Sequence, residues 1–162
     1  MNSDIISSLF LKTYMSFTYK RINQEVRPPE RQTKYSGGYD LHIPYDVVLK
    51  PYKKTVVPSG LILNIPIGYV GLIKNRSSFY LKNIKIFEGT IDSDYKEELV
   101  FIITNKTRKP VKLIKNMRIG QIVITHCFQK ECLDIDGKDV INKEIDENIK
   151  ERKGGFGSTG SF

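Results

Sequence analysis

Three short segments of the 162-residue chain combine residue types that could act together in chemistry. Ser36–Leu41 (SGGYDL) is a glycine turn that leads an acidic residue into a strand. Gly89–Tyr95 (GTIDSDY) places two carboxylates and an aromatic ring at the tip of a predicted hairpin, where a carboxylate can act as a general base. Gly154–Gly160 (GGFGSTG) can present backbone N–H groups and hydroxyls to phosphate, and its one phenylalanine offers a stacking face for a base.

The elements that position these segments are predicted to be strands. The chain has no alanine, the best helix former, but it has 21 isoleucines, nine tyrosines and eight phenylalanines, which favour strands. Short apolar runs recur with glycine and proline between them, which indicates an all-β sandwich or barrel. We expect strands at Ser16–Ile22, Tyr39–Ile43, Val47–Leu49, Thr55–Val57, Leu61–Ile65, Tyr69–Lys74, Ile84–Phe87, Leu99–Thr104, Val111–Ile114 and Ile119–Thr125.

The length predicts one domain, flanked by segments of different character. Residues 1–15 form an N-terminal extension that we expect to be disordered. Residues 16–130 form the predicted barrel, and residues 131–153 are a charged connecting segment. Residues 154–162 are a glycine-rich tail with too little apolar surface for a core element, so we expect it to be flexible.

The formal net charge of +8 favours an anionic partner, and nucleic acid, nucleotide and membrane surface all satisfy that condition. Because the basic residues are scattered, a solvated surface is the default interpretation. No apolar run approaches the roughly 20 residues of a membrane-spanning helix. We expect Cys127 and Cys132 to be idle thiols. The first residues lack a secretory signal pattern, so a reducing cytoplasmic or nuclear location is expected.

In this order and spacing, the segments resemble the motifs of the trimeric dUTPase family (dUTP diphosphatases), over about residues 16–160. The five motifs fall at SGGYDL, Asn75–Ser78 (NRSS), GTIDSDY, Arg118–Ile122 (RIGQI) and GGFGSTG. The resemblance implies a distorted jelly roll or β-barrel that forms a homotrimer, with shared active sites closed by the flexible C-terminal tail. It also implies Mg²⁺-dependent hydrolysis of dUTP to dUMP and pyrophosphate, which keeps uracil out of DNA and supplies dUMP for dTMP synthesis.

Roles for individual residues follow from the same resemblance. Asp92 would be the general base that orients a water for attack on the α-phosphorus, while Asp94 would stabilise the turn. Tyr95 would lie beneath the deoxyribose and exclude a 2′-hydroxyl. The Mg²⁺ would be held mainly by the phosphates of the substrate. Asp40 would therefore order either the water shell of the metal or a neighbouring basic residue. The implied substrate-binding residues are Arg76, Ser77, Ser78, Gly89, Ile91, Tyr95, Gln121, Arg152, Phe156, Gly157, Ser158 and Thr159.

Within that set the resemblance separates uracil from phosphate contacts. Main-chain groups around Ile84–Ile91 would read uracil, and Phe156 would stack on it. Arg76, Ser77 and Gln121 would contact the phosphates, and Ser158 with Thr159 would hold the γ-phosphate.

Several positions depart from the usual motifs of the family. Asn75 stands where proline is typical, and Ser78 stands where glycine is common. Lys96-Glu97 replaces Arg-Gly, and Met117 precedes Arg118 where an aspartate is usual. Arg152 lies four residues before Phe156 rather than five, so its contact with the γ-phosphate depends on a shift that the glycines can absorb. The base, the ring under the sugar and the stacking phenylalanine are retained, so we expect activity.

Two other functions remain compatible with the residues. A dCTP deaminase would share the architecture but would need a different acid/base group at the cytosine amine, and the intact GTIDSDY segment argues against it. A non-enzymatic regulatory or nucleic-acid-binding protein on the same scaffold would use the +8 charge. Exposed aromatic residues interleaved with the basic ones are not obvious in the sequence, so we expect no specific nucleic-acid binding.

Overall fold

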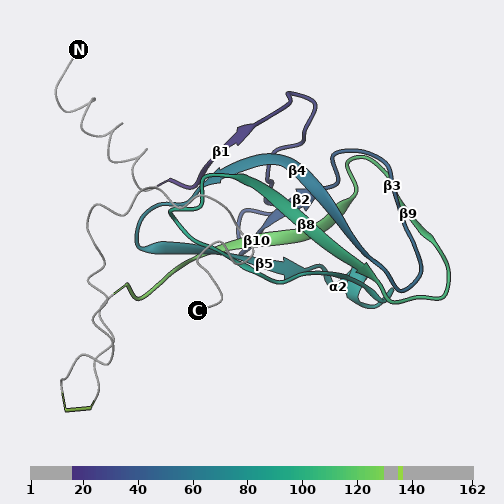
Figure 1. Ribbon diagram of the computed structural model, residues 1–162. Helices are drawn as coiled ribbons and strands as arrows, with labels where there is room; N and C mark the ends of the chain where they lie inside the picture. Colours follow the sequence, from purple (N-terminus) through teal and green to yellow (C-terminus); the bar gives the residue numbers. More distant parts are fainter. Residues whose placement is uncertain (1–15, 130–134, 137–162) are drawn as a thin grey trace.

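The computed structural model describes residues 16–129, 135 and 136 of the chain. Ten strands and one short helix make up this part of the chain (Figure 1). In chain order they are β1 (Thr18–Arg21), β2 (Tyr39–His42), β3 (Val47–Leu49), β4 (Lys54–Asn64), β5 (Tyr69–Asn75), α2 (Ser77–Tyr80), β6 (Ile84–Ile86), β7 (Thr90–Ile91), β8 (Glu98–Asn105), β9 (Val111–Leu113) and β10 (Arg118–His126). The expected all-β fold class is confirmed.

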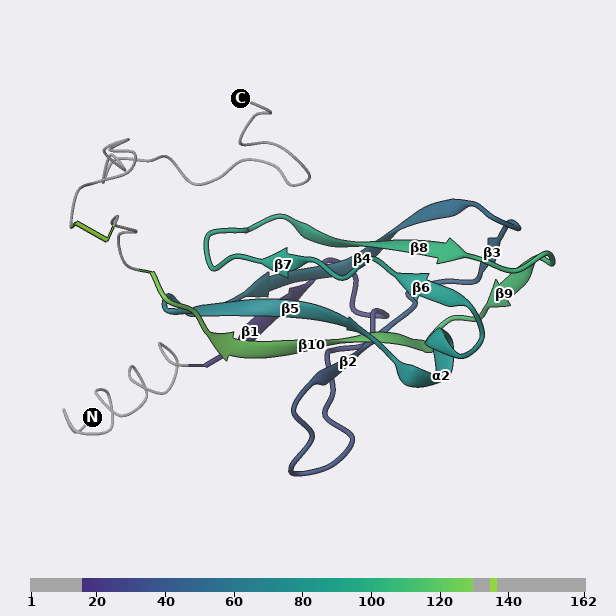
Figure 2. The same ribbon diagram turned by 90° about the horizontal axis from the view of Figure 1, so that it is seen from below.

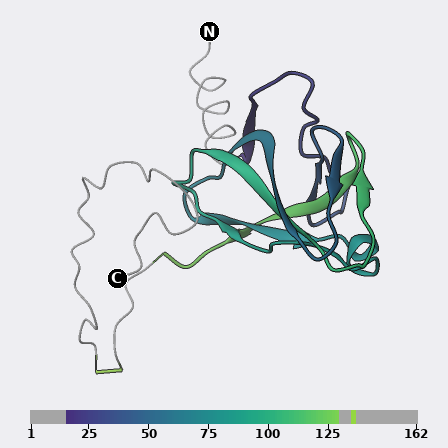
Figure 3. The same cartoon turned by 45° about the vertical axis from the view of Figure 1, so that its right-hand side comes forward.

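The strands form two antiparallel four-stranded sheets and a two-stranded ribbon. One sheet, called sheet A, has the strand order β1-β4-β8-β6, and sheet B has the order β2-β10-β5-β7. Figure 2 shows the two sheets as layers with β4 and β8 in one and β5 and β10 in the other. The ribbon of β3 and β9 lies at one end of the layers, beside α2 (Figure 3). This arrangement is a distorted jelly roll.

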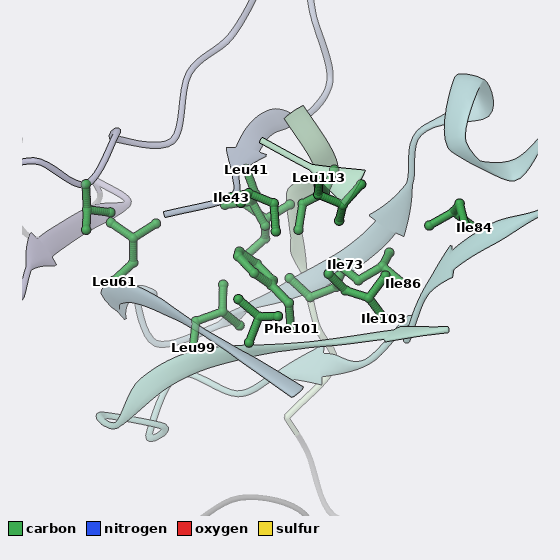
Figure 4. Close-up of a cluster of buried hydrophobic side chains, with 14 of the residues drawn as sticks. Leu41, Ile43, Leu61, Ile73, Ile84, Ile86, Leu99, Phe101, Ile103 and Leu113 are labelled. Carbon is green, nitrogen blue, oxygen red and sulfur yellow. The ribbon is translucent and has the colours of Figure 1, made fainter. Parts of the chain in front are cut away.

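The core lies between the two sheets and is almost entirely aliphatic. In β8 every second residue is buried, so Leu99, Phe101 and Ile103 face the core while the residues between them face outward. Figure 4 shows the ring of Phe101 among leucine and isoleucine side chains from both sheets. The buried cluster is Val26, Leu41, Ile43, Leu49, Val57, Leu61, Leu63, Ile73, Ile84, Ile86, Leu99, Phe101, Ile103, Leu113, Ile119 and Ile122.

The two strands predicted at Thr55–Val57 and Leu61–Ile65 are one strand, β4. The sequence prediction broke the strand at Pro58, because proline cannot donate a ladder hydrogen bond. In the structure the pairing of β4 with β8 shifts register between Pro58 and Ile62, and this irregularity accommodates the proline. Gly60 takes a φ of +73° there, and its N–H donates to Glu98 Oε1 at 2.6 Å.

Two further elements differ from the prediction. The one-turn helix α2 lies between β5 and β6, where the sequence predicted no helix. Gly89–Tyr95 lies in the connection between β6 and β8, which pair antiparallel in sheet A, so the predicted hairpin is present. Within this connection the short strand β7 pairs with β5 of sheet B, which the sequence did not predict. The tip of this hairpin therefore contacts the second layer before the chain returns to sheet A.

No helix in the described part of the chain is long and apolar enough to cross a membrane. The expectations for residues 1–15, 131–134, 137–153 and 154–162 lie outside the described residues.

Candidate active site

A buried carboxylate braced by two guanidinium groups is the centre of the candidate anion site. Asp40 lies in β2 with 8% of its surface exposed. Its Oδ2 accepts a hydrogen bond from Arg118 Nη1 at 3.2 Å, and Arg76 Nε lies 3.7 Å from its Oδ1. Arg76 also donates from Nη1 to the backbone oxygen of Arg118 at 3.2 Å. The carboxylate thus offsets part of the charge of two arginines and fixes their orientation.

The fourth motif positions its residues through an irregularity in β10. Arg118 pairs with His42 and Gly120 with Leu41, so Ile119 is an extra residue between them. This shift buries the Ile119 side chain in the core and leaves Arg118 half-buried beside Asp40. Gln121 follows, opposite Asp40 on one side and Lys74 on the other.

Gly38 of the first motif leaves room for Gln121. A Cβ atom at Gly38 would lie 2.5 Å from Gln121 Oε1 and 3.3 Å from the backbone oxygen of Ile122. The side chain of Gln121 in the fourth motif can therefore take this position only because the first motif has glycine at residue 38.

The serines of the second motif open α2. Arg76 precedes the helix with extended backbone, and its carbonyl oxygen accepts hydrogen bonds from the N–H groups of Phe79 and Tyr80 at 3.0 Å. Ser77 and Ser78 are exposed at the start of the helix. The resemblance gave phosphate contacts to Arg76, Ser77 and Gln121. These three residues and Ser78 lie at the same end of sheet B.

The candidate base lies in a tight turn at the start of the β7–β8 connection. The N–H of Tyr95 donates to the backbone oxygen of Asp92 at 3.2 Å, and the Tyr95 hydroxyl donates to the backbone oxygen of Glu98 at 2.9 Å. These bonds hold the tyrosine ring against the turn. Asp92 is half-buried whereas Asp94 is exposed.

The predicted uracil-reading segment is held against β5. The carbonyl oxygen of Gly89 accepts a hydrogen bond from the N–H of Ile73 at 3.0 Å. Ile91 pairs with Gly71, and its half-buried side chain packs on the core. The backbone of Gly89–Ile91 is thus ordered by sheet B, whereas Ile84–Ile86 is strand β6 of sheet A.

One chain does not bring Asp92 and Arg76 together. Thr90 pairs with Leu72 and Ile91 with Gly71, so the chain runs away from Arg76 as it approaches Asp92. Asp92 would face the position before Gly71, which is about 20 Å from Arg76 along β5 at about 3.3 Å per residue. In Figure 2 the β7–β8 connection lies at one end of the molecule and α2 at the other.

Sequence reasoning missed a hydrogen-bonded cluster that joins the second motif to the uracil-reading segment. Asn75 Nδ2 donates to the backbone oxygen of Ile86 at 3.1 Å, and Asn75 Oδ1 accepts from the N–H of Ile86 at 2.9 Å. Glu88 Oε1 accepts from the N–H and from Nδ2 of Asn75, and Lys74 Nζ donates to Glu88 Oε2 at 3.2 Å. The available signal was the departure at Asn75, because proline there could supply neither the N–H nor the amide.

These hydrogen bonds predict a pH-dependent contribution of Glu88 to stability. Donation from Asn75 and then from Lys74 lowers the pKa of Glu88 from 4.5 to about 2. A carboxyl group whose pKa is lowered by folding stabilises the fold above pH 4.5, and that contribution is lost as the pH falls toward 2. The side chain is 43% exposed, so solvent screening leaves about 1 kcal/mol, or about 3 °C in Tm.

The comparison that tests this contribution is the Tm of Glu88→Gln against the unchanged chain from pH 7 to pH 3. We expect the difference to be largest at pH 7 and to shrink below about pH 4.5, with the exposed Glu97→Gln as the control. A difference that is constant with pH would contradict the assignment.

The described residues contain no group of three or more His, Cys, Asp or Glu side chains that could hold a metal ion. His42 is buried in β2, and burial lowers its pKa. Within that part of the chain, Cys127 is a free thiol. Both oxygens of Asp40 face guanidinium groups, so in this structure the carboxylate is paired with two basic residues. Arg152, Phe156, Gly157, Ser158 and Thr159 lie outside the described residues.

Fold and site together define an all-β jelly-roll protein with a carboxylate-braced pair of arginines at one end of a sheet and an acidic turn at the other. A sequence model of the dUTPase family matches residues 24–160. The chain belongs to the dUTPase family.

Individual relatives agree with this family. The chain is 35% identical over 149 residues to the deoxyuridine 5′-triphosphate nucleotidohydrolase of Nautilia profundicola, covering 90% of this chain and 99% of that protein. It is 34% identical over 145 residues to the protein of the same name from Fowlpox virus, covering 88% and 96%. A mutant dUTPase of Staphylococcus bacteriophage 80alpha, solved with dUpNHpp, has 28% identity and a TM-score of 0.67, covering 90% of this chain and 98% of that chain.

Proposed function

We propose that the protein hydrolyses dUTP to dUMP and pyrophosphate. The observation that carries the proposal is the combination of family membership with the GTIDSDY turn, in which Asp92 is half-buried beside the anchored Tyr95. Removal of dUTP keeps uracil out of DNA and supplies dUMP for dTMP synthesis. Among the described residues no feature favours a dCTP deaminase, whose reaction needs an acid/base group at the cytosine amine.

Asp92 acts as the general base in this proposal, accepting a proton from the water that attacks the α-phosphorus. A positioned base contributes about 10²–10⁴-fold. Arg76, oriented by Asp40, and Gln121 bind phosphate oxygens, and the serines that open α2 add hydroxyl donors. Tyr95 lies under the deoxyribose, and main-chain groups near Gly89 and Ile91 read uracil. Because these main-chain groups would form hydrogen bonds with uracil, cytosine, whose donors and acceptors differ, would be strongly excluded.

The active site is shared between copies of the chain in a homotrimer. The separation of Asp92 from Arg76 supports this proposal, since a single chain cannot place both at one phosphate. The outer face of sheet A also supports it. Outward positions in the middle of β4 and β8 are apolar, with Val56 paired to Ile102 and Pro58 paired to Val100, and Val56 is 62% exposed. An apolar face of this kind is suited to burial against another copy.

Mg²⁺ enters the proposal as a partner of the triphosphate. The donor chemistry fits, because Mg²⁺ prefers oxygen ligands and commonly uses substrate phosphates, while both Asp40 oxygens already face arginines. When bound, the ion neutralises charge on the phosphate oxygens. We also propose a reducing cytoplasmic or nuclear location, where nucleotide pools occur and the free thiol of Cys127 is stable.

A pyrophosphate-release assay over dUTP, dTTP, dCTP and UTP, with and without Mg²⁺, tests the activity. We expect release from dUTP alone and only with Mg²⁺. Ammonia release from dCTP would favour the deaminase instead, and no turnover of any of the four would favour a non-enzymatic protein.

Deletion of all residues after Arg152 is expected to remove most of the turnover and to leave the fold and the oligomer intact. The deleted segment carries the ring of Phe156 and the hydroxyls of Ser158 and Thr159, which stack on the base and donate to the γ-phosphate in this proposal. Single-turnover hydrolysis at saturating dUTP measures the loss. Phe156→Ala should show a smaller loss, because base–aromatic stacking is worth about 1–3 kcal/mol. Equal rates for the truncated and full-length chains would mean that the segment plays no part in the reaction.

A further inference from the structure

An exposed tyrosine occupies an unfavourable backbone conformation at one end of the barrel. In the turn after β3 the N–H of Lys53 donates to the backbone oxygen of Lys50 at 3.3 Å, Pro51 comes second, and Tyr52 has a φ of +55°. Turns of this pattern use glycine or asparagine at that position. The other described non-glycine residues with positive φ are asparagines, Asn83 and Asn116.

The ring of Tyr52 does not explain this strain by packing, because the residue is 64% exposed. Strained positions retained in a fold are candidates for function.

A buried asparagine forms hydrogen bonds with two turns that carry basic residues, one of them the turn of Tyr52. Asn105, fully buried at the end of β8, donates from Nδ2 to the backbone oxygens of Leu49 at 3.1 Å and Lys109 at 2.9 Å. Its own N–H donates to the backbone oxygen of Lys53 at 3.2 Å. The β3–β4 and β8–β9 turns are therefore fixed side by side, at the end of the molecule where Figure 1 labels β3 and β9. We call the exposed residues of these two turns the basic cap: Lys50, Tyr52, Lys53, Lys106, Arg108 and Lys109.

The cations of the basic cap have no acidic neighbours in sequence to neutralise them. Residues 47–87 and 99–129 contain no aspartate or glutamate. The ion pairs found among the described residues do not use the five cations of the cap, whereas nearby Lys112 is paired with Asp46 at 2.8 Å. The cap therefore presents five positive charges and one exposed ring on two rigid turns.

We propose that the basic cap binds single-stranded nucleic acid without sequence preference. Lysine and arginine side chains around the turns contact backbone phosphates, and the ring of Tyr52 stacks on a base. The stacking ring is the reason to favour a single strand over a duplex, whose bases are already stacked. The sequence did not predict this surface, because folding places Tyr52 among lysines from a distant turn. None of the cap residues belongs to the proposed substrate site.

Fluorescence anisotropy of a labelled oligothymidylate of about 12 nucleotides, titrated with the full chain at several salt concentrations, tests the proposal. We expect log K to fall with log salt by about 0.7 per phosphate contacted. Lys53→Gln with Lys106→Gln should reduce that slope by about 1.4. Lys20→Gln with Lys34→Gln, an equal loss of exposed charge elsewhere, should leave it unchanged.

The aromatic contact is tested at Tyr52. Tyr52→Gly suits the positive φ, so the fold should stay at least as stable while affinity falls about 5-fold or more. Tyr52→Phe should keep the affinity. Tyr35→Gly removes a ring that is 86% exposed outside the cap and should also keep it.

All of these variants should hydrolyse dUTP at the unchanged rate. A loss of oligonucleotide binding can therefore be distinguished from a loss of catalysis. Any of four results would overturn the proposal: no oligonucleotide binding at low salt, an equal loss in the two lysine pairs, unchanged affinity of Tyr52→Gly, or tighter binding to a duplex or to phosphatidylglycerol vesicles.

Discussion

Turnover of dUTP by the Asp92→Asn variant is expected to fall by about 10²-fold or more, while substrate binding stays close to that of the unchanged chain. The amide keeps the shape of the carboxylate but cannot accept a proton from the attacking water. The turn itself should persist, because its hydrogen bond runs from Tyr95 N–H to the backbone oxygen of Asp92. Single-turnover hydrolysis measures the chemical step, and titration with a slowly hydrolysed dUTP analogue measures binding.

Asp94→Asn is the matched control, since it makes the same change two positions along the same turn on an exposed side chain. It should keep turnover near that of the unchanged chain. If Asp94→Asn abolished turnover and Asp92→Asn did not, the roles of the two carboxylates would be exchanged. A loss of binding in Asp92→Asn would instead mean that the carboxylate positions the substrate.

The sequence predicted the fold class and most strands because alternating apolar residues leave few choices in a two-layer protein. The strand at Leu99–Thr104 is an example, since its alternation survives in β8 with one residue added at each end. The same reasoning failed at Pro58, where the local rule against proline in a strand is overridden by the irregular pairing with β8. It predicted the hairpin around Gly89–Tyr95 but not the pairing of β7 with sheet B, because sequence patterns do not say which sheet a short strand joins.

The candidate site was predictable where a motif carries the chemistry and not where long-range contacts complete it. The resemblance of short local motifs is enough to name Asp92, Tyr95 and Arg76 as candidates. The bracing of Arg76 and Arg118 by Asp40 joins three segments that are distant along the chain, and only the register of β2, β10 and β5 brings them together. The Asn75 amide likewise gained its partners from the proximity of β6 and Glu88, which no spacing rule indicates.

The separation of Asp92 from Arg76 makes a second large effect testable. Asp92→Asn and Arg76→Ala should each be nearly inactive alone, and mixing them should restore activity after the subunits are dissociated and reassembled together. Sites that take Asp92 from an Arg76→Ala chain and Arg76 from an Asp92→Asn chain contain both groups. Random mixing of equal amounts produces that pairing in about a quarter of sites. The oligomer, measured by light scattering, should be about three times the 18.6 kDa chain.

Restored activity in the mixture has one structural explanation, because neither chain alone carries both groups. Asp40 remains paired with Arg118 in the Arg76→Ala chain, so the carboxylate is not left buried without a charged partner. The fold of that variant should therefore survive, and its Tm provides the check. A mixture of Asp92→Asn with Tyr95→Ala, which removes the ring under the sugar, is the control, since both changes fall on the same turn and should be supplied by the same chain. If the Arg76 mixture stayed inactive under conditions that exchange subunits, the two groups would not meet across an interface.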